Sequence, residues 1–175
     1  MSRAFVKEDA SDERVVVPAR APLPEGVTNL VTASGLRALH AERGALEAER
    51  SRIEAAGSAT DRARALLVVD ERLEALEARI ATARLAPAPS DPGADVAVGS
   101  EVDVRRDDGR ALRVRIVGVD ESDPARGLIA FTAPIAAALL GLRVGDTVQA
   151  LGSEFTVTGV RYPADDAARQ AAPPA

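Results

Sequence analysis

The sequence predicts an α+β protein in which an N-terminal antiparallel helical hairpin is followed by a small antiparallel sheet domain with one helix. Apolar residues recur at helical spacing from about residue 32 to residue 84, with one break near Gly57. Residues 86–93, with three prolines, then end the helical pattern. From Val96 onward, apolar and polar residues alternate with the period of a β-strand. This change of period separates a helical part from a sheet part.

Composition narrows the possible classes of protein. Hydrophobic residues make up 46% of the 175 residues but aromatic residues only 2%, so the core must consist mainly of aliphatic side chains. The absence of cysteine excludes disulfides and thiolate metal sites, and the single histidine, His40, cannot form a multi-histidine site. A net charge of −5 argues against non-specific binding to nucleic-acid phosphates. Because the sequence contains no long apolar run and no signal-peptide core, we expect a cytoplasmic protein.

The chain is expected to have five segments. Residues 1–28 contain several prolines and no sustained period, which predicts a flexible N-terminal arm. Residues 30–85 are expected to form the helical hairpin, a coiled coil, and residues 86–95 a Pro-rich linker. Residues 96–163 are expected to form the sheet domain, and residues 164–175 a flexible tail.

Each helix of the predicted hairpin carries an apolar stripe. The first helix is expected at about residues 32–55 and the second at about residues 60–84. Each stripe is too narrow to be buried except against the other helix. Arg43 and Arg50 interrupt the first stripe and are expected to extend along it toward glutamates. The apolar positions are Leu36, Leu39, Leu46 and Ile53 in the first helix, and Leu66, Val69, Leu73, Leu76, Ile80 and Ala83 in the second.

The sheet domain is predicted to hold four or five strands and one short helix. The helix is expected to begin at Pro134 and to stop at Gly141, residue types that are typical of a first turn and of the position after the last. Asp120–Glu121 indicates a turn, with a metal-binding pair as the alternative. Asp107-Asp108-Gly109 is a hairpin-turn signal, and later strands are expected at residues 128–131, 147–151 and 155–162.

Six short motifs follow one another in the C-terminal half: Asp107-Asp108-Gly109, Arg115-Ile116-Val117-Gly118, Asp120-Glu121, Ala133-Pro134-Ile135-Ala136, Leu139-Leu140-Gly141 and Val144-Gly145-Asp146. In this order and near this spacing they resemble the C-terminal domain of the GreA/GreB transcript-cleavage factors, which bind bacterial RNA polymerase. The resemblance covers about residues 30–162, because a helical hairpin, a linker and a small sheet domain occur in the same order. It implies that the sheet domain is FKBP-like.

The resemblance also implies a binding site for RNA polymerase. In the family, a loop with a Ser-Pro step docks this domain on the rim of the secondary channel, against a coiled coil of the largest polymerase subunit. The matching loop here consists of Thr132, Ala133, Pro134 and Ile135. Its proline and the following apolar residue match the family, whereas Thr132 replaces an acidic residue. The implied partners are RNA polymerase and, indirectly, nascent RNA or DNA, with no membrane.

The tip of the hairpin carries the candidate catalytic and metal-binding residues. In cleaving members of the family, two acids at the tip hold a second Mg²⁺ at the polymerase active site, where it activates water. Gly57, Asp61 and Ala63 match the family motif, but Ser58 replaces the first acid and Arg62 replaces an asparagine. One carboxylate alone holds Mg²⁺ poorly.

Three interpretations of the tip stay open. Asp61 binds Mg²⁺ by itself, or Glu54 and Asp61 together replace the missing acid pair across the turn. Alternatively, Ser58 and Asp61 form a capping box that opens the second helix. Each arm is also shorter than in the family by roughly one heptad, which corresponds to about 10 Å of reach at 1.5 Å per residue. The shorter arms and Ser58 both disfavour cleavage.

We therefore expect a Gre-like factor that binds RNA polymerase at the secondary channel and regulates transcription elongation without efficient transcript cleavage. It would not be an enzyme, since any catalysis belongs to the polymerase, and its only cofactor would be Mg²⁺ shared with that active site. Alternatives are an active cleavage factor that uses Asp61 and a regulator similar to Rnk, whose coiled coil is also reduced. From other classes, a hairpin-mediated oligomeric scaffold stays open, whereas a peptidyl-prolyl isomerase is disfavoured because few aromatic residues are available to line its site.

Overall fold

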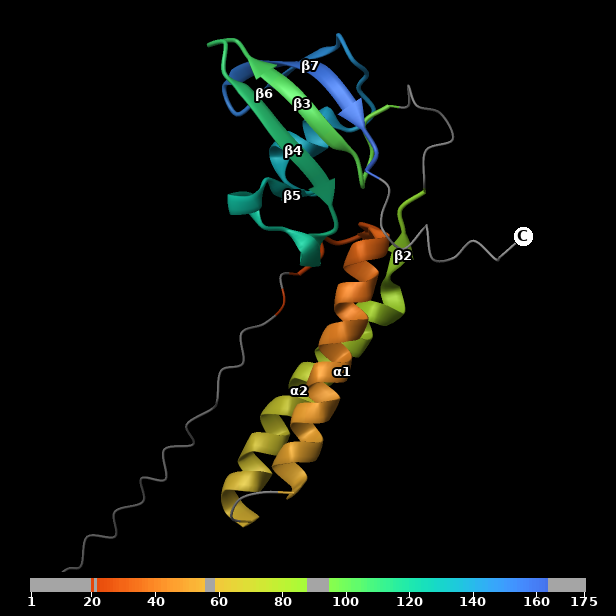
Figure 1. Cartoon of the computed structure of the whole chain (residues 1–175), viewed down its shortest axis with the longest axis vertical. Helices are drawn as coiled ribbons and strands as arrows, with labels where there is room; N and C mark the ends of the chain where they lie inside the picture. Colours follow the sequence, from red (N-terminus) through yellow and green to blue (C-terminus); the bar gives the residue numbers. More distant parts are fainter. Residues whose placement is uncertain (1–19, 21, 56–58, 88–94, 164–175) are drawn as a thin grey trace, which may run out of the picture.

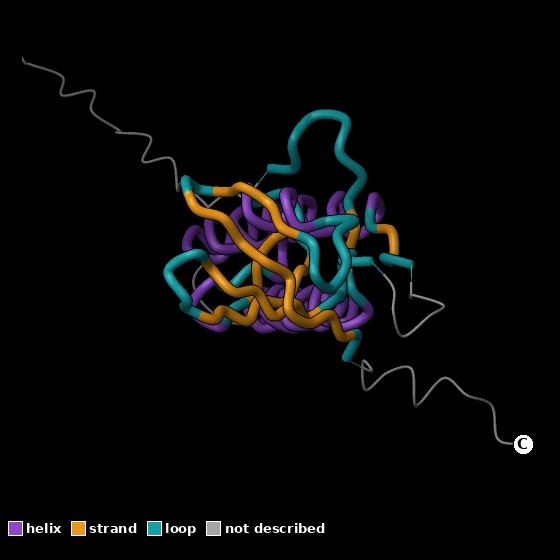
Figure 2. The backbone as a smooth tube through the Cα atoms, turned by 90° about the horizontal axis from the view of Figure 1, so that it is seen from above, coloured by secondary structure: helices purple, strands orange, loops and turns teal. Residues whose placement is uncertain are grey.

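A computed structural model describes residue 20 and residues 22–55, 59–87 and 95–163. A long hairpin of two helices projects from a domain built on a β-sheet (Figure 1). Seen from above, the strands of the sheet lie over the helices (Figure 2). The predicted fold class, a helical hairpin followed by a small sheet domain, is confirmed.

The hairpin consists of helix α1, Ala33–Ala55, and helix α2, Ala59–Thr82. At 1.5 Å per residue, each helix is a rod about 35 Å long. The two predicted apolar stripes pack against each other, and Leu39, Leu46 and Leu76 form a buried cluster between the helices. The helix bounds therefore agree with the prediction to within two residues.

Ion pairs line the exposed sides of the hairpin. Nε of Arg50 lies 2.7 Å from Oδ1 of Asp70 on the other helix, and its Nη1 lies 2.7 Å from Oε1 of Glu54. Nε of Arg43 lies 3.5 Å from Oε1 of Glu47. Both arginines that interrupt the apolar stripe thus reach acidic groups, as predicted. Exposed pairs of this kind contribute little to stability because solvent screens their charges.

Two short strands at the base of the hairpin were not predicted. Strand β1, Leu30–Val31, precedes α1, and strand β2, Arg84–Leu85, follows α2. They pair in parallel, with Leu30 opposite Arg84 and Val31 opposite Leu85. The second helix consequently ends at Thr82 and not at residue 84. Backbone hydrogen bonds therefore join the two flanks of the hairpin.

Five strands form the second sheet, in the spatial order β5-β4-β3-β7-β6. They are β3, Glu101–Arg106; β4, Ala111–Val117; β5, Leu128–Ala130; β6, Thr147–Ala150; and β7, Ser153–Arg161. The pairs β3/β4, β3/β7 and β6/β7 are antiparallel, as predicted. The pair β4/β5 is parallel, so the prediction of a wholly antiparallel sheet is wrong at β5.

The parallel strand follows from the connection that precedes it. Between β4 and β5 the chain forms two short 3₁₀ helices, η1 at Val119–Glu121 and η2 at Pro124–Arg126, instead of a tight hairpin turn. This crossover brings Leu128 alongside Arg115, so β5 runs in the same direction as the end of β4, residues 115–117. The FKBP-like character of the domain stays a prediction.

The core of the sheet domain lies between one face of the sheet and helix α3, Pro134–Leu139. Because side chains alternate along a strand, every second residue of the central strands is buried there. Helix α3 begins at Pro134, and the chain turns at Gly141, where φ is +82°, as the sequence predicts. The buried aliphatic residues include Val102, Val104, Val114, Ile116, Leu139 and Val157.

The opposite face of the sheet carries charged side chains. Asp103 on β3 lies directly across from Arg113 on β4, and Nε of Arg113 donates to Oδ1 of Asp103 at 2.7 Å. Nη2 of Arg161 lies 2.8 Å from Oε1 of Glu101 and 2.9 Å from Oδ2 of Asp103. The hydrogen bond from Arg113 lowers the pKa of Asp103, outweighing the opposing effect of burial, and the charge of Arg161 lowers it further.

No helix among the described residues is both long enough and apolar enough to cross a membrane.

Candidate functional site

The predicted docking loop lies between strand β5 and helix α3. The N–H of Phe131 donates to the carbonyl of Val117 at 2.9 Å, and the N–H of Ala133 donates to that of Ala130 at 2.8 Å. Ala133 is also the N-cap of α3, with the extended backbone that a following proline favours. The loop is therefore held on both sides by regular structure.

Of the four predicted partner-binding residues, Pro134 alone is exposed. Thr132 is half-buried, and Ala133 and Ile135 are half-buried against the core of the sheet domain. A proline fits the first position of a helix because its missing N–H would have no partner within the helix there. The structure thus brings the four residues together in one turn and presents the proline ring to solvent.

The candidate residues at the hairpin tip lie at the ends of α1 and α2, farthest from the sheet domain (Figure 1). Glu54 is exposed in the last turn of α1, and Asp61 is exposed in the first turn of α2. Ser58 lies outside the described residues, so its predicted capping role stays a prediction. The carboxylate of Glu54 accepts a hydrogen bond from Arg50 at 2.7 Å.

The described residues of the tip do not fit a Mg²⁺ site. Mg²⁺ requires several oxygen ligands, and carboxylates serve it best when they are not engaged by cations. Glu54 is paired with Arg50, and Nη1 of Arg62 donates to the carbonyl oxygen of Glu54 at 3.2 Å. Within residues 20, 22–55, 59–87 and 95–163, no group of three or more His, Asp or Glu residues could hold a metal ion. Asp61 stays a metal candidate only as a prediction.

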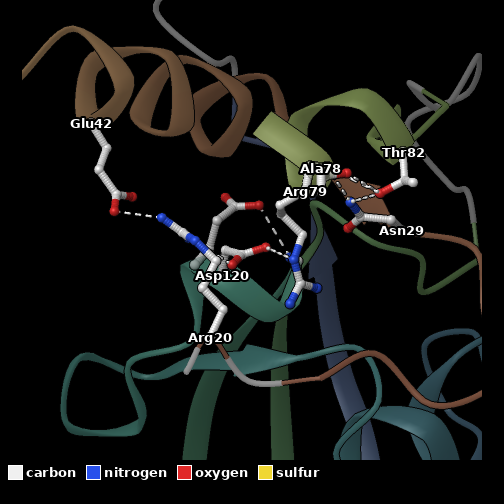
Figure 3. A network of polar contacts seen from close by, with 9 residues as sticks. Arg20, Asn29, Glu42, Ala78, Arg79, Thr82 and Asp120 are labelled. Atoms are coloured by element: carbon white, nitrogen blue, oxygen red, sulfur yellow. Dashed lines mark hydrogen bonds and ion pairs between the residues drawn. The ribbon is translucent and has the colours of Figure 1, made fainter. Parts of the chain in front are cut away.

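A buried polar network at the base of the hairpin connects it to the sheet domain (Figure 3). Asp120, on η1, has a side chain only 9% exposed. Its Oδ1 accepts a hydrogen bond from Nη1 of Arg20 at 3.0 Å, and its Oδ2 lies 3.5 Å from Nε of Arg79 on α2. Arg20 also pairs with Glu42 on α1. The Asp120 carboxylate of the sheet domain therefore lies between two cations, Arg20 from the segment before the hairpin and Arg79 from its second helix.

The electrostatics of this network favour the charged form of Arg20. Burial lowers the pKa of Arg20, but its hydrogen bonds to Glu42 and Asp120 outweigh burial, so the pKa lies above its ordinary value. The buried Arg79 also holds the chain through its backbone, because its carbonyl accepts a hydrogen bond from Nδ2 of Asn29 at 2.9 Å. The same amide nitrogen donates to Oγ1 of Thr82 at 3.1 Å. The segment before the hairpin is thus tied to the end of α2 (Figure 3).

Glu121, the next residue along η1, contacts the start of the first helix. Its Oε1 accepts hydrogen bonds from the N–H of Thr32 at 3.0 Å and from the N–H of Gly118 at 3.1 Å. The hydroxyl of Thr32 donates to Oε2. The acidic pair Asp120–Glu121 therefore forms a turn, as predicted, but both of its carboxylates are also bound to the hairpin.

These contacts were missed by the sequence reasoning. Arg20 and Asp120 are 100 positions apart, and Thr32 and Glu121 are 89 apart, so no local pattern links them. One signal was present nonetheless. Thr32 is a good N-cap residue, yet the position three residues later is Gly35 and not the usual Glu or Gln. An N-cap without its acidic partner indicates that a carboxylate from elsewhere can complete the cap.

Together, fold and site define a two-part protein, in which a small sheet domain carries the predicted docking turn and a long helical rod is fixed to that domain by buried ion pairs. A sequence model of the family described as "Transcription elongation factor, GreA/GreB, C-term" matches residues 91–162. The resemblance stated from the motifs is therefore confirmed. Residues 91–162 are similar to the GreA/GreB C-terminal domain.

Individual proteins agree with the family match. The transcription elongation factor GreA of Alkalilimnicola ehrlichii is 38% identical over 100 residues, which cover 54% of this chain and 63% of that protein. GreB of Xanthomonas axonopodis pv. citri is 40% identical over 93 residues, which cover 52% of this chain and 55% of that protein. The chain thus spans between half and two thirds of the length of these relatives.

Among solved structures, GreA factor homolog 1 (Gfh1) of Thermus thermophilus is 19% identical, with a TM-score of 0.37. The alignment covers 77% of this chain and 99% of that one. The GreA/GreB factor of Nitrosomonas europaea is 20% identical, with a TM-score of 0.36. That alignment covers 76% of this chain and 98% of the other chain.

Proposed function

We propose that this protein binds bacterial RNA polymerase through its sheet domain, on the rim of the secondary channel, and regulates transcription elongation without efficient transcript cleavage. The observation that carries the proposal is the GreA/GreB C-terminal domain at residues 91–162, in which Pro134 is the exposed residue of the docking turn. The partner would be the coiled coil of the largest polymerase subunit, and the site of action the bacterial cytoplasm.

The hairpin supports regulation by occupancy of the channel and not by chemistry at its tip. A helical rod about 35 Å long can enter a channel. Its tip, however, pairs Glu54 with Arg50 and places Arg62 beside it, which supplies positive charge where Mg²⁺ needs negative charge. We therefore assign no metal to the tip, and any catalysis belongs to the polymerase.

Competition with a cleaving Gre factor tests the binding site. The assay measures transcript cleavage by a backtracked elongation complex that contains a cleaving factor, with increasing amounts of this protein. We expect the wild-type protein to inhibit cleavage and Pro134→Ala to weaken that inhibition at least tenfold. Pro124→Ala is the matched control, because Pro124 is also exposed and also begins a short helix of the same domain. Equal inhibition by all three proteins would rule out the docking turn.

The same complex without a cleaving factor tests the tip. We expect no stimulation of cleavage by the wild-type protein and no change with Asp61→Ala. Stimulation that Asp61→Ala abolishes would establish an active cleavage factor instead. Failure both to compete and to stimulate would overturn the polymerase assignment, and light scattering would then decide whether the protein is an oligomeric scaffold.

A further inference from the structure

Helix α1 begins with an incomplete cap. Thr32 is its N-cap, and the N–H of Gly35 donates to Oγ1 of Thr32 at 3.0 Å. In a complete capping box, a Glu or Gln at the position of Gly35 would accept the N–H of the N-cap residue. Glycine has no side chain to do so, and the first turn of α1 contains no acidic residue.

Glu121 of the sheet domain supplies the missing carboxylate. Its Oε1 accepts the N–H of Thr32 at 3.0 Å, which is the bond that a local Glu would make. The same oxygen accepts the N–H of Gly118 at 3.1 Å and so closes the cap of η1. A single carboxylate therefore caps two helical segments, one in the hairpin and one in the sheet domain. Negative charge at a helix N-terminus also interacts favourably with the helix dipole.

Two glycines make room for this carboxylate. A Cβ atom at Gly35 would lie 2.6 Å from Cγ of Glu121 and closer still to Cδ and Oε1. A Cβ atom at Gly118 would lie 2.8 Å from the carbonyl oxygen of Leu30 and 2.9 Å from Oε1 of Glu121. Because three donors hold the carboxylate, it cannot move away from a larger residue without losing hydrogen bonds. The backbone is thus shaped around the position of Glu121.

The hairpin and the sheet domain have separate apolar cores. One core contains Leu39, Leu46 and Leu76 of the helices, and the other contains the strands and α3. Among the described residues that flank the hairpin, the partly buried Leu30 and Ala86 pack against the core of the sheet domain. Packing alone therefore restrains the hairpin at one place. A second point of attachment is needed to fix the direction of the rod.

We propose that Glu121 is a positioning residue, which fixes the direction of the hairpin relative to the docking turn by capping α1 from the sheet domain. Its neighbour Asp120 pairs with Arg79 on α2, so η1 is attached to both helices. Attachment to two helices opposes rotation of the rod about its base. A rod of about 35 Å that tilts by 15° displaces its tip by about 9 Å. This inference rests on the proposed function only in its last step, that direction matters for occupying the channel.

The direction of the hairpin can be measured in the isolated protein. Because the chain has no cysteine, spin labels can be attached to Leu67→Cys on α2 and Val144→Cys on the sheet domain, whose native residues are 70% and 61% exposed. Pulsed electron paramagnetic resonance then gives the distribution of distances between the labels. We expect one narrow distribution in the labelled parent protein.

Gly35→Ala and Gly44→Ala form a matched pair in this experiment. Both lie in α1, but a Cβ atom at Gly44 meets nothing within 4 Å, whereas one at Gly35 displaces Glu121. We expect Gly44→Ala to keep the narrow distribution and Gly35→Ala to broaden or shift it. Glu121→Ala should broaden it likewise, and Glu121→Gln should keep it because the amide oxygen can still accept both N–H groups. An unchanged distribution in Gly35→Ala and Glu121→Ala would overturn the proposal.

A double-mutant cycle separates the cap from a general defect of folding. Gly35→Ala should lower the midpoint of thermal unfolding in the parent protein. In the Glu121→Ala background it should not lower the midpoint, because the three atoms that the added Cβ would meet first are then absent and alanine favours a helix more than glycine does. Equal losses in both backgrounds would show that Glu121 is not the cause, which would overturn the proposal.

The competition assay described above supplies the functional readout. We expect Gly35→Ala to inhibit cleavage at least threefold less than Gly44→Ala. A broadened distribution with unchanged inhibition would overturn the positioning role while leaving polymerase binding intact. If the wild-type protein does not compete at all, the proposed function fails, and the distance distributions still decide whether Glu121 fixes the hairpin.

Discussion

Removal of the Asp120 carboxylate is expected to destabilise the protein more than removal of any surface charge. Asp120 and Arg79 each have side chains only 9% exposed, so their charges are largely shielded from water. In Asp120→Ala the Arg79 guanidinium stays buried but loses this counter-charge. Arg20 simultaneously loses its hydrogen bond of 3.0 Å to Oδ1.

The expected size follows from these two contacts. A hydrogen bond to a charged group contributes roughly 1.5–3 kcal/mol. Breaking a buried ion pair costs about 3–5 kcal/mol when one partner stays behind without compensation. Because Arg79 makes further interactions and the Arg20 side chain is 22% exposed, we expect the lower part of this range, about 3 kcal/mol. Asp120→Asn keeps an acceptor for Arg20 and is expected to cost about half as much.

Urea denaturation monitored by circular dichroism measures this loss of stability at neutral pH. The midpoint temperature of thermal unfolding should fall by roughly 6–12 °C. Glu77→Ala is the control, because it removes the same charge from an exposed position of α2 and should change the free energy of unfolding by less than about 0.5 kcal/mol. A loss below about 1 kcal/mol for Asp120→Ala would refute the view that this network stabilises the base of the hairpin.

Two further predictions concern the sheet domain. The pKa of Asp103 is lowered in the folded protein, chiefly by the hydrogen bond that Arg113 donates to it. The Asp103 carboxylate therefore stabilises the fold at any pH above the pKa that Asp103 has in the unfolded chain. This stabilisation is lost as the pH falls through the lower pKa of the folded protein. Asp103→Asn should therefore lower stability at pH 7 and flatten the decline of stability in acid, measured by urea denaturation from about pH 6 to about pH 2.5; an unaltered acid decline would contradict this. Leu151 is 71% exposed at the β6–β7 turn with a φ of +50°, beside Gly152 at +76°, a backbone that disfavours a leucine. Leu151→Asn should raise the free energy of unfolding by about 1 kcal/mol in the same assay, and a loss of stability would indicate that the leucine makes a packing contribution.

Much of the fold could be predicted because its elements are long and periodic. The stripes of α1 and α2 repeat over more than twenty residues each, so the helices and their mutual packing follow from spacing alone. The same holds for β3 and β4, where alternation and the Asp107-Asp108-Gly109 turn predict an antiparallel pair. Pro134 and Gly141 predict the bounds of α3 for the local reasons that proline suits a first turn and glycine a positive φ.

The elements that could not be predicted are short or depend on distant residues. Strand β5 has only three residues, and an apolar segment of that length does not reveal its direction. Strands β1 and β2 have two residues each and exist only because the hairpin brings them together. The docking turn was predicted as a set of four residues, but its exposure was not, since only the packed structure shows that Ile135 faces the core while Pro134 does not.

The distribution of polar contacts indicates which part of the hairpin has a specified geometry. At the tip, the hydrogen bond from Arg50 to Glu54 and that from Arg62 to the Glu54 carbonyl are exposed to solvent, where such contacts contribute little. At the base, Asp120 and Glu121 are bound through buried or half-buried contacts to both helices, and glycines leave space for one of them. The contacts at the base therefore specify the direction of the rod relative to the sheet domain. A specified direction is what the proposed occupancy of the secondary channel requires.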